Sequence, residues 1–245
     1  MAASEKSRQE DQPAYVLHSY PFRETSLVVE IFSRNFGRLA VVARGARRPK
    51  SALRGLLLSF QPLQLAWFGK SELRTLHKAE WQGGLPLLQG MALICGFYLN
   101  ELLVKLLHRD DPHEALFQYY EETLHALSAS KSEADYAAIL RRFEKHFLQE
   151  LGYALTLDHD VETGEEVDAA ASYFFQIEKG PLRRAGTGQN GVQLLGKTLL
   201  DMAADDYADP VTQQQSKMLM RTLINHYLGG ESLHTRQLLI DLQQL

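Results

Sequence analysis

The spacing of apolar residues changes near residues 82–86, and this change constrains the fold more than any other feature of the chain. Before it, residues 14–80 consist of short stretches rich in β-branched and aromatic side chains, which are typical of strands. After it, apolar side chains recur three or four positions apart, as in amphipathic helices. Gly83, Gly84 and Pro86 mark the junction. The sequence therefore predicts an α+β chain, with strands first and helices after them.

The strand-rich part predicts a small barrel. We expect five strands, at residues 14–20, 26–33, 38–45, 60–69 and 72–81. Five short strands with no long helix between them favour an OB-fold, and a small open β-sandwich is the alternative. Residues 1–12 are polar, so we expect a flexible tail there and an OB-fold domain at 13–81.

The remainder predicts an α-helical bundle. Residues 87–108 are apolar nearly all round, which indicates a buried helix. Capping residues followed by proline or acidic residues predict further helix starts at Asp111, Ser132 and Asp209.

One acidic, Gly-rich stretch interrupts the helices. Residues 156–191 have no strong period and contain one expected strand, at 172–178. We therefore expect a helical domain formed by 82–155 and 192–245, with 156–191 as an insertion.

Charge is distributed unevenly along the chain. The net charge is −4, yet residues 1–80 carry +6 and residues 81–245 carry −10. No acidic residue occurs from Ile31 to Ser71. Such asymmetry is typical of a module that binds a polyanion and is joined to another domain.

The acid-free window holds the candidate DNA-binding residues. They are Arg34, Arg38, Arg44, Arg47, Arg48, Lys50, Arg54 and Lys70. Gly45 and Pro49 predict a loop whose cations project together, and clustered cations bind phosphates by releasing counterions. Candidate stacking faces for unpaired bases are Phe36, Trp67 and Phe68. The alternative is a solvated basic loop with the aromatic side chains in the core.

Two nucleotide-binding patterns overlap near the end of the insertion. Residues 191–198 match the P-loop formula, with Lys197 as its lysine, and residues 186–191 match the dinucleotide fingerprint. Each formula requires a preceding strand and a following helix in a parallel α/β unit. Here residues 180–185 are expected to form a loop and Val192 to begin a helix. A Gly-rich loop that enters a helix is therefore favoured, with a P-loop-type hydrolase using Lys197 as the alternative.

A second basic group lies on the predicted helix that contains Phe143 and Phe147. Arg141, Arg142 and Lys145 are expected on the side away from these phenylalanines. A basic rim beside an apolar surface can receive an acidic, hydrophobic peptide tail. The alternative is a solvated helix face.

The sequence offers no catalytic motif and no metal-ligand set. Cys95 is the only cysteine, and neither a nucleophile elbow nor an HExxH helix occurs. We therefore expect no catalysis, no metal and no cofactor. The polar N-terminus and the lack of a long apolar stretch favour a cytoplasmic protein with no membrane association.

Five blocks, taken in this order, resemble the RecO family of bacterial recombination mediators. They are residues 14–38, 41–63, 96–107, 140–153 and 227–239. The resemblance implies an N-terminal OB-fold, a helical bundle and a small zinc-ribbon-like insertion. It also implies binding to single- and double-stranded DNA, annealing of complementary strands, and association with the nucleoid. The implied partners are RecR, RecA (indirectly) and the acidic C-terminal tail of single-strand-binding protein.

Some family members bind zinc through paired cysteines in the insertion. Here the resemblance puts the first pair near Asp160 and Thr163, and the second near Arg183 and Gly186. None is cysteine, so the insertion resembles the zinc-free branch of the family. Nucleotide consumption separates the hydrolase from a DNA-binding mediator. Salt-dependent DNA binding separates the mediator from an OB-fold adaptor that binds only protein.

Overall fold

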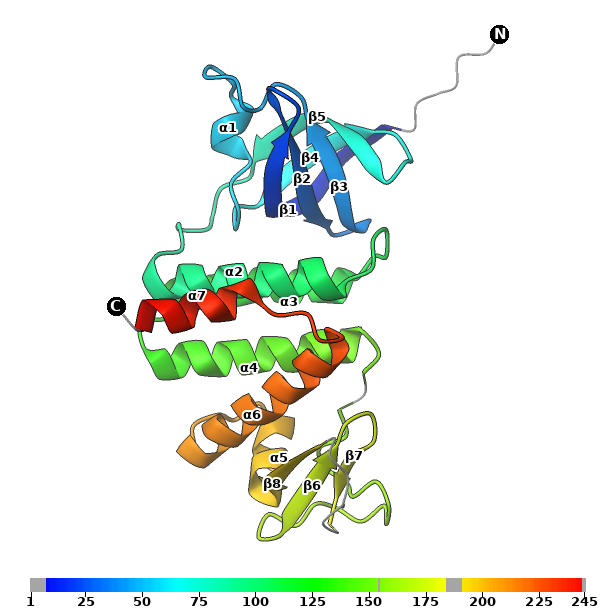
Figure 1. Ribbon diagram of the computed structural model, residues 1–245, viewed down its shortest axis with the longest axis vertical. Coiled ribbons are helices and arrows are strands. Elements are labelled where there is room, and N and C mark those ends of the chain that lie inside the picture. Colours follow the sequence, from blue (N-terminus) through cyan, green and yellow to red (C-terminus); the bar gives the residue numbers. More distant parts are fainter. Residues whose placement is uncertain (1–7, 154, 184–190, 244–245) are drawn as a thin grey trace. The chain divides into compact units, whose positions relative to one another are not determined.

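The computed structural model describes residues 8–153, 155–183 and 191–243 (Figure 1). The strands are β1 (Arg8–Phe22), β2 (Ser26–Ser33), β3 (Gly37–Ala43), β4 (Leu63–Phe68), β5 (Leu73–Trp81), β6 (Ser172–Gln176), β7 (Gly180–Leu182) and β8 (Gly191–Leu195). The helices are α1 (Leu53–Leu56), α2 (Gly90–Leu106), α3 (Glu114–Ala129), α4 (Glu133–Glu150), α5 (Gly196–Ala203), α6 (Pro210–Tyr227) and α7 (His234–Gln243).

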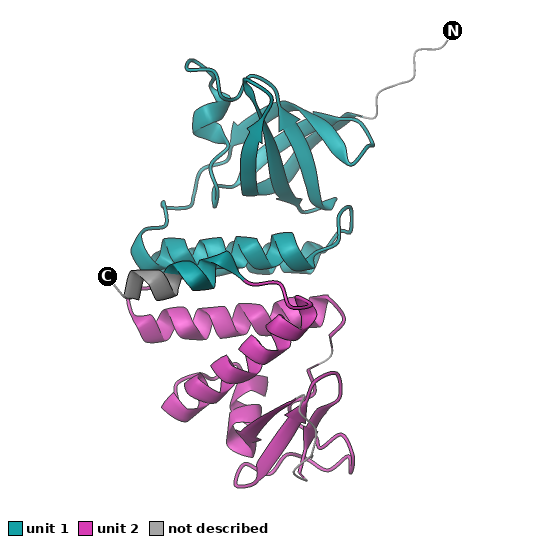
Figure 2. Ribbon diagram, in the orientation of Figure 1, with its two compact units in different colours: residues 1–129, 233–245 teal, residues 130–232 magenta. Residues whose placement is uncertain are grey.

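The chain forms two compact units (Figure 2). The first comprises residues 1–129 and 233–245, and the second comprises residues 130–232. The expected helical domain is thus shared between them, since α2, α3 and α7 group with the barrel. None of the helices in the described ranges is long and apolar enough to cross a membrane.

Five strands close a barrel in the first unit, which confirms the predicted OB-like fold. Their order is β1–β2–β3–β5–β4, and β4 pairs back onto β1. Val29, Ile31, Leu39, Val41 and Trp67 belong to the buried cluster that fills it. Because closure gives each strand two neighbours, the sheet has no open edge.

The first strand begins earlier than expected. Residues 1–12 were predicted to form a tail, yet β1 starts at Arg8, and Arg8 and Gln9 pair with Phe68 and Trp67 of β4. Strand pairing supplies backbone hydrogen bonds to these polar residues, and hydropathy carries no signal of that pairing.

Helices α2 and α3 pack against the barrel. The ring of Tyr15 on β1 lies 5.5 Å from Phe117 and 5.3 Å from Tyr120, between centroids. The buried Asn100 side chain of α2 donates to the carbonyl of Leu17 at 2.8 Å and accepts from the Tyr120 hydroxyl at 2.5 Å. A buried amide needs such partners, so this network fixes α2 and α3 on β1.

The second unit combines α4, α5 and α6 with the three-stranded sheet β7–β6–β8. Two predicted helix caps are confirmed. The Ser132 hydroxyl accepts from the N–H of Asp135 at 3.1 Å, and the Asp209 carboxylate accepts from the N–H of Val211 at 2.7 Å. Strand β6 confirms the strand that was expected in the insertion.

The predicted helix start at Val192 is wrong, because residues 191–195 form strand β8. Val192 and Leu194 are buried while Gln193 and Leu195 are exposed, which is the two-residue period of a strand. Strand β8 pairs antiparallel with β6, and this distant partner decides the conformation of a stretch with little local preference.

Candidate nucleic-acid interface

The basic segment, defined as residues 44–54, leaves β3 and leads into α1 (Figure 1). Its backbone is built from consecutive turns, since the N–H groups of Arg48, Ser51 and Arg54 each donate to the carbonyl three residues earlier, at 3.0–3.2 Å. Gly45 starts the series with a φ of 69°, a conformation that glycine adopts without steric cost. The expected loop is therefore an ordered, tightly turned segment.

Apolar side chains anchor the basic segment to the barrel. Ala46 and Leu57 belong to the buried barrel cluster, and Leu53 packs against it. Ala46 and Leu53 lie between the cations in sequence, and Leu57 follows the last of them, while the charged side chains stay exposed. Burial of the anchors holds the backbone, and the cations need no rearrangement to present a charged surface.

Five predicted DNA-binding residues share this surface. Exposed side chains of the segment are Arg44, Arg47, Arg48, Lys50 and Arg54. Within the described parts of the chain, none of these five forms an ion pair with a carboxylate. Cations without protein counter-ions are the groups that bind phosphate while giving up the fewest existing interactions.

Arg23 joins this surface, and the sequence interpretation missed it. The Arg47 guanidinium donates to the carbonyls of Arg23 and Glu24 at 3.4 and 3.3 Å, and the Arg47 N–H donates to the carbonyl of Thr25 at 2.9 Å. The turn between β1 and β2 is thereby held against the basic segment. Arg23 is exposed, with its guanidinium 5.2 Å from the centre of the Phe22 ring. Glu24 and Glu30 lie between Arg23 and the acid-free window, so the window did not include Arg23.

Arg38 is not part of the exposed surface, which corrects its prediction. Its guanidinium pairs with Glu30 at 3.2 Å and donates to the carbonyl of Leu107 at 3.0 Å. Arg109 also pairs with Glu30. Burial lowers the pKa of Arg38, and the charge of Glu30 opposes that shift. Arg38 therefore belongs to the contact between the barrel and the α2–α3 connection.

Arg34 and Lys70 lie apart from the basic segment. Arg34 is half-buried in the β2–β3 turn, with its guanidinium 5.3 Å from the centre of the Phe117 ring. Lys70 is exposed in the β4–β5 turn (cyan in Figure 1), which projects from the barrel away from α1. The eight predicted residues thus do not form one patch, and only five of them cluster.

The candidate stacking residues lie mainly in the barrel wall. Trp67 is fully buried, and Phe36 packs on it edge to face at 5.4 Å between ring centroids. Phe68 is half-buried beside His77. The core interpretation of the aromatics is therefore correct for Trp67. Tyr20 on β1 is 42% exposed and is a better-placed ring, three residues before Arg23.

The cations of α4 are engaged within the second unit. Arg141 pairs with Glu144 at 2.6 Å, and Arg142 donates to the carbonyl of Asp205 at 3.0 and 3.1 Å. Lys145 pairs with the Asp205 carboxylate at 2.7 Å and donates to the carbonyl of Met202 at 2.8 Å. The connection between α5 and α6 therefore covers the helix face that was expected to be free.

The prediction of an exposed basic rim is wrong for Lys145, which is only 4% exposed. Arg141 and Arg142 are half-buried. Phe143 and Phe147 are fully buried on the same helix, so α4 is covered on more than one side. The charge pattern of α4 alone does not indicate that the connection between α5 and α6 covers this helix.

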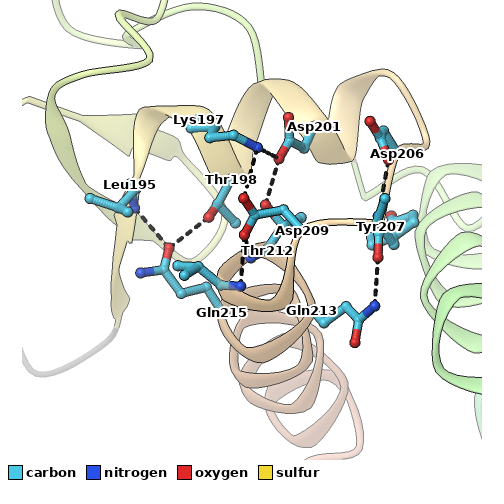
Figure 3. A network of polar contacts seen from close by, with 12 residues as sticks. Leu195, Lys197, Thr198, Asp201, Asp206, Tyr207, Asp209, Thr212, Gln213 and Gln215 are labelled. Atoms are coloured by element: carbon cyan, nitrogen blue, oxygen red, sulfur yellow. Dashed lines mark hydrogen bonds and ion pairs between the residues drawn. The ribbon is translucent and has the colours of Figure 1, made fainter. Parts of the chain in front are cut away.

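Lys197 lies in a network that links α5 to α6 (Figure 3). Its ammonium group contacts Asp201 at 2.5 Å and Asp209 at 3.3 Å. The Thr212 hydroxyl donates to the same Asp201 carboxylate at 2.6 Å. The hydrogen bond with Asp201 and the pairing with Asp209 raise the pKa of Lys197. The charge of Lys197 therefore helps to hold α5 against the start of α6.

The P-loop match does not form a phosphate cradle. Such a cradle needs backbone N–H groups that point at the ligand. Here the N–H of Leu195 donates to Gln215 at 2.9 Å, that of Gly196 to Ala171 at 2.8 Å, and that of Lys197 to Ala169 at 3.0 Å. The glycines serve close packing instead, as a Cβ on Gly196 would lie 2.0 Å from a backbone oxygen. The dinucleotide pattern falls largely on residues 184–190, outside the described residues.

Comparison with known proteins agrees with this architecture. The family model described as "Recombination protein O N terminal" matches residues 8–84, and "Recombination protein O C terminal" matches residues 88–237. The DNA repair protein RecO of Nitrosospira multiformis is 62% identical over 242 residues, covering 98% of this chain and 99% of that protein. The DNA repair protein RecO of Dechloromonas aromatica is 56% identical over 241 residues, covering 98% and 99%. The chain therefore belongs to the RecO family of DNA repair proteins.

Proposed function

We propose that this chain, which its family places in DNA repair and recombination, is a non-catalytic mediator that binds DNA through the basic segment. The observation that carries the proposal is the group of five exposed cations, held on the barrel by buried anchors and free of carboxylate partners among the described residues. Contacts of this kind are made to phosphates. Binding is therefore expected with single and double strands and with little dependence on base sequence.

Annealing follows from the same charges. Two complementary strands repel each other through their phosphates, and cations that neutralise part of this charge lower the cost of bringing them together. No covalent bond changes in this step. We propose further that the chain acts at the nucleoid with RecR, and helps to load RecA onto DNA coated by single-strand-binding protein.

Titration of labelled single- and double-stranded DNA at several salt concentrations tests the DNA-binding proposal. Replacement of Arg44, Arg47, Arg48 and Lys50 by Ala should weaken binding to both forms. The log–log salt slope should fall by about 0.7 to 0.9 for each phosphate that the variant no longer neutralises. A matched control replaces four exposed cations of the second unit by Ala: Lys131, Lys179, Lys217 and Arg221.

The control has the same change in net charge and should keep affinity and slope close to those of the unaltered protein. Equal reductions in affinity for the two quadruple variants would show that overall charge, rather than the basic segment, determines binding. Salt-independent or absent binding by the unaltered protein would favour the protein-only adaptor.

Binding of the acidic tail of single-strand-binding protein is a separate part of the proposal. Arg141 and Arg142 stay candidates only if a peptide carboxylate displaces their contacts with Glu144 and Asp205. Fluorescence anisotropy with a tail peptide tests this, using the double variant R141A/R142A and a thermal melt to verify folding. Unchanged affinity in a folded double variant would place the tail on another surface.

A further inference from the structure

Asp160 holds together two segments of the insertion that are far apart in sequence. Its side chain is buried, with the residue only 3% exposed. One carboxylate oxygen, Oδ1, accepts from the N–H groups of Glu162 at 2.8 Å and Thr163 at 3.1 Å. The other, Oδ2, accepts from the N–H of Arg183, just beyond β7, at 2.7 Å. One carboxylate thus bridges a tight turn and the end of a strand.

Backbone contacts place the turn directly against β7. The N–H of Gly164 donates to the carbonyl of Asp160 at 2.8 Å, which closes the turn. The N–H of Val161 donates to the carbonyl of Pro181 at 3.0 Å. Gly180 allows close approach, because a Cβ there would lie 2.7 Å from the Val161 side chain. Asp160 is therefore at the centre of the joint between the two segments.

The surroundings of this carboxylate favour its ionised form. Burial acts to raise the pKa of Asp160, but the three backbone N–H bonds and the charge of Arg183 outweigh it, so the pKa lies below its usual value. Charge-assisted hydrogen bonds from N–H groups are stronger than neutral ones. Three of them compensate the cost of burying the charge.

The residues of this joint do not fit a metal ion. Asp160, Thr163 and Arg183 lie near three of the positions at which the family resemblance implies zinc ligands, and Gly186 lies outside the described residues. The N–H groups that surround the Asp160 oxygens carry partial positive charge and would repel a cation. Within the described ranges, no three His, Cys, Asp or Glu side chains are grouped as metal ligands.

We propose that the Asp160 carboxylate performs the cross-linking that a metal ion would perform in an insertion of this shape. It ties the 160–165 turn to the end of β7 by hydrogen bonds alone. The insertion then holds its fold without a metal and without cysteine chemistry. This proposal concerns the architecture of the second unit and stands independently of the proposed DNA binding.

Amide hydrogen exchange on the full-length protein tests the proposal, with and without EDTA. In Asp160→Asn, the amide group cannot accept on both sides, because its NH₂ would face an N–H donor. One side therefore loses its acceptor, and the other keeps only a neutral one. The backbone amides on the side that loses its acceptor should exchange about tenfold faster or more, and those on the other side should exchange faster by a smaller factor. EDTA should change nothing in the unaltered protein.

Two further variants make the result specific. Asp158→Asn is the matched control, two residues away with its side chain 63% exposed, and should exchange like the unaltered protein. Asp160→Ser keeps an oxygen for the turn but is too short to reach Arg183, so it should release the Arg183 amide more than the turn. Unchanged amides in α4 and α6 verify that the second unit of each variant is folded.

Two results would overturn the proposal. One is an insertion that loosens when EDTA is added to the unaltered protein, which is decisive even if every Asp160 variant fails to fold. The other is unchanged protection of the three amides in a folded Asp160→Asn variant.

Discussion

The basic segment of the first unit and the α4 cations of the second unit have similar sequences and opposite environments. Residues 44–50 and 141–145 are both short runs in which arginines and a lysine are closely spaced. The cations of residues 44–50 are exposed and have no carboxylate partners among the described residues. In the second unit Lys145 and both arginines bond to Glu144 and to residues 202–205. A run of cations is therefore a candidate binding site only where the fold leaves it without partners.

The physical distinction is the cost of removing a charge from water. Lys145 is almost fully buried, and its desolvation is offset by a carboxylate and a carbonyl at hydrogen-bonding distance. Arg48 and Lys50 keep their hydration and remain able to exchange it for phosphate contacts. The first kind of cation contributes to stability and the second to binding, and the predictions below separate the two.

The largest expected effect is on Lys145. Lys145→Ala leaves Asp205 without its buried partner, and should lower the free energy of unfolding of the second unit by about 2–3 kcal/mol. This lies below the usual range for fully buried pairs because the Asp205 side chain is 35% exposed. Urea unfolding followed by circular dichroism measures the decrease, with exposed Lys131→Ala as control. DNA affinity should not change, and a fall in affinity of the folded variant would break the comparison.

Arg23 is an exposed cation, and we expect it to contribute to DNA binding rather than to stability. Arg23→Ala removes one exposed charge beside the basic segment, so DNA affinity should fall roughly fivefold and the salt slope by about 0.7 to 0.9. The urea midpoint should stay the same. Arg221→Ala, an exposed arginine of the second unit, is the control. If the two variants bind DNA alike, the turn between β1 and β2 is not part of the interface.

The carboxylate of Glu101 in the first unit shows that anions, too, can contribute to stability when the fold supplies them with partners. Glu101 on α2 accepts from the N–H groups of His234 and Thr235 at 2.8 and 2.9 Å and from the Thr235 hydroxyl at 2.7 Å. Burial acts to raise the pKa of Glu101, but these bonds and Lys105 outweigh it, so the pKa is lowered. A lowered pKa in the folded state stabilises the fold above the ordinary value, 4.5, and this contribution disappears as the pH falls below it.

Glu101→Gln should therefore cost about 1 kcal/mol at neutral pH and progressively less in acid. Thermal melts between neutral pH and pH 3 measure the difference, and Glu122→Gln, an exposed change on α3, serves as control. A cost that stays constant across this range would mean that the charge of Glu101 does not hold α7 on α2.

The smallest effect is expected at Lys197. Its ion pairs with Asp201 and Asp209 are exposed to solvent on the lysine side, and such pairs contribute little to stability. Lys197→Ala should leave the urea midpoint, DNA binding and annealing unchanged. DNA-stimulated release of phosphate from ATP that disappears in this variant would instead support the hydrolase.

The sequence alone determined the features that depend on local period and composition. The strand-forming stretches before Trp81, the caps at Ser132 and Asp209 and the acid-free window each follow from a few neighbouring residues. The core position of Trp67 also agrees with the core interpretation of the barrel aromatics. Such signals are readable because helices and strands repeat every three to four or every two residues.

The tertiary structure decided which charged side chains are exposed without a carboxylate partner and which are paired within the fold. Arg38 bonds to Glu30 and to the carbonyl of Leu107, and Lys145 pairs with Asp205. Arg47 bonds to the carbonyl of Arg23 and so holds the β1–β2 turn beside the basic segment. The tertiary structure likewise made residues 191–195 a strand, through pairing with β6. In each case the deciding partner lies between eight and 69 positions away. Local composition reports what a segment prefers, but desolvation and pairing depend on which distant segment folds against it.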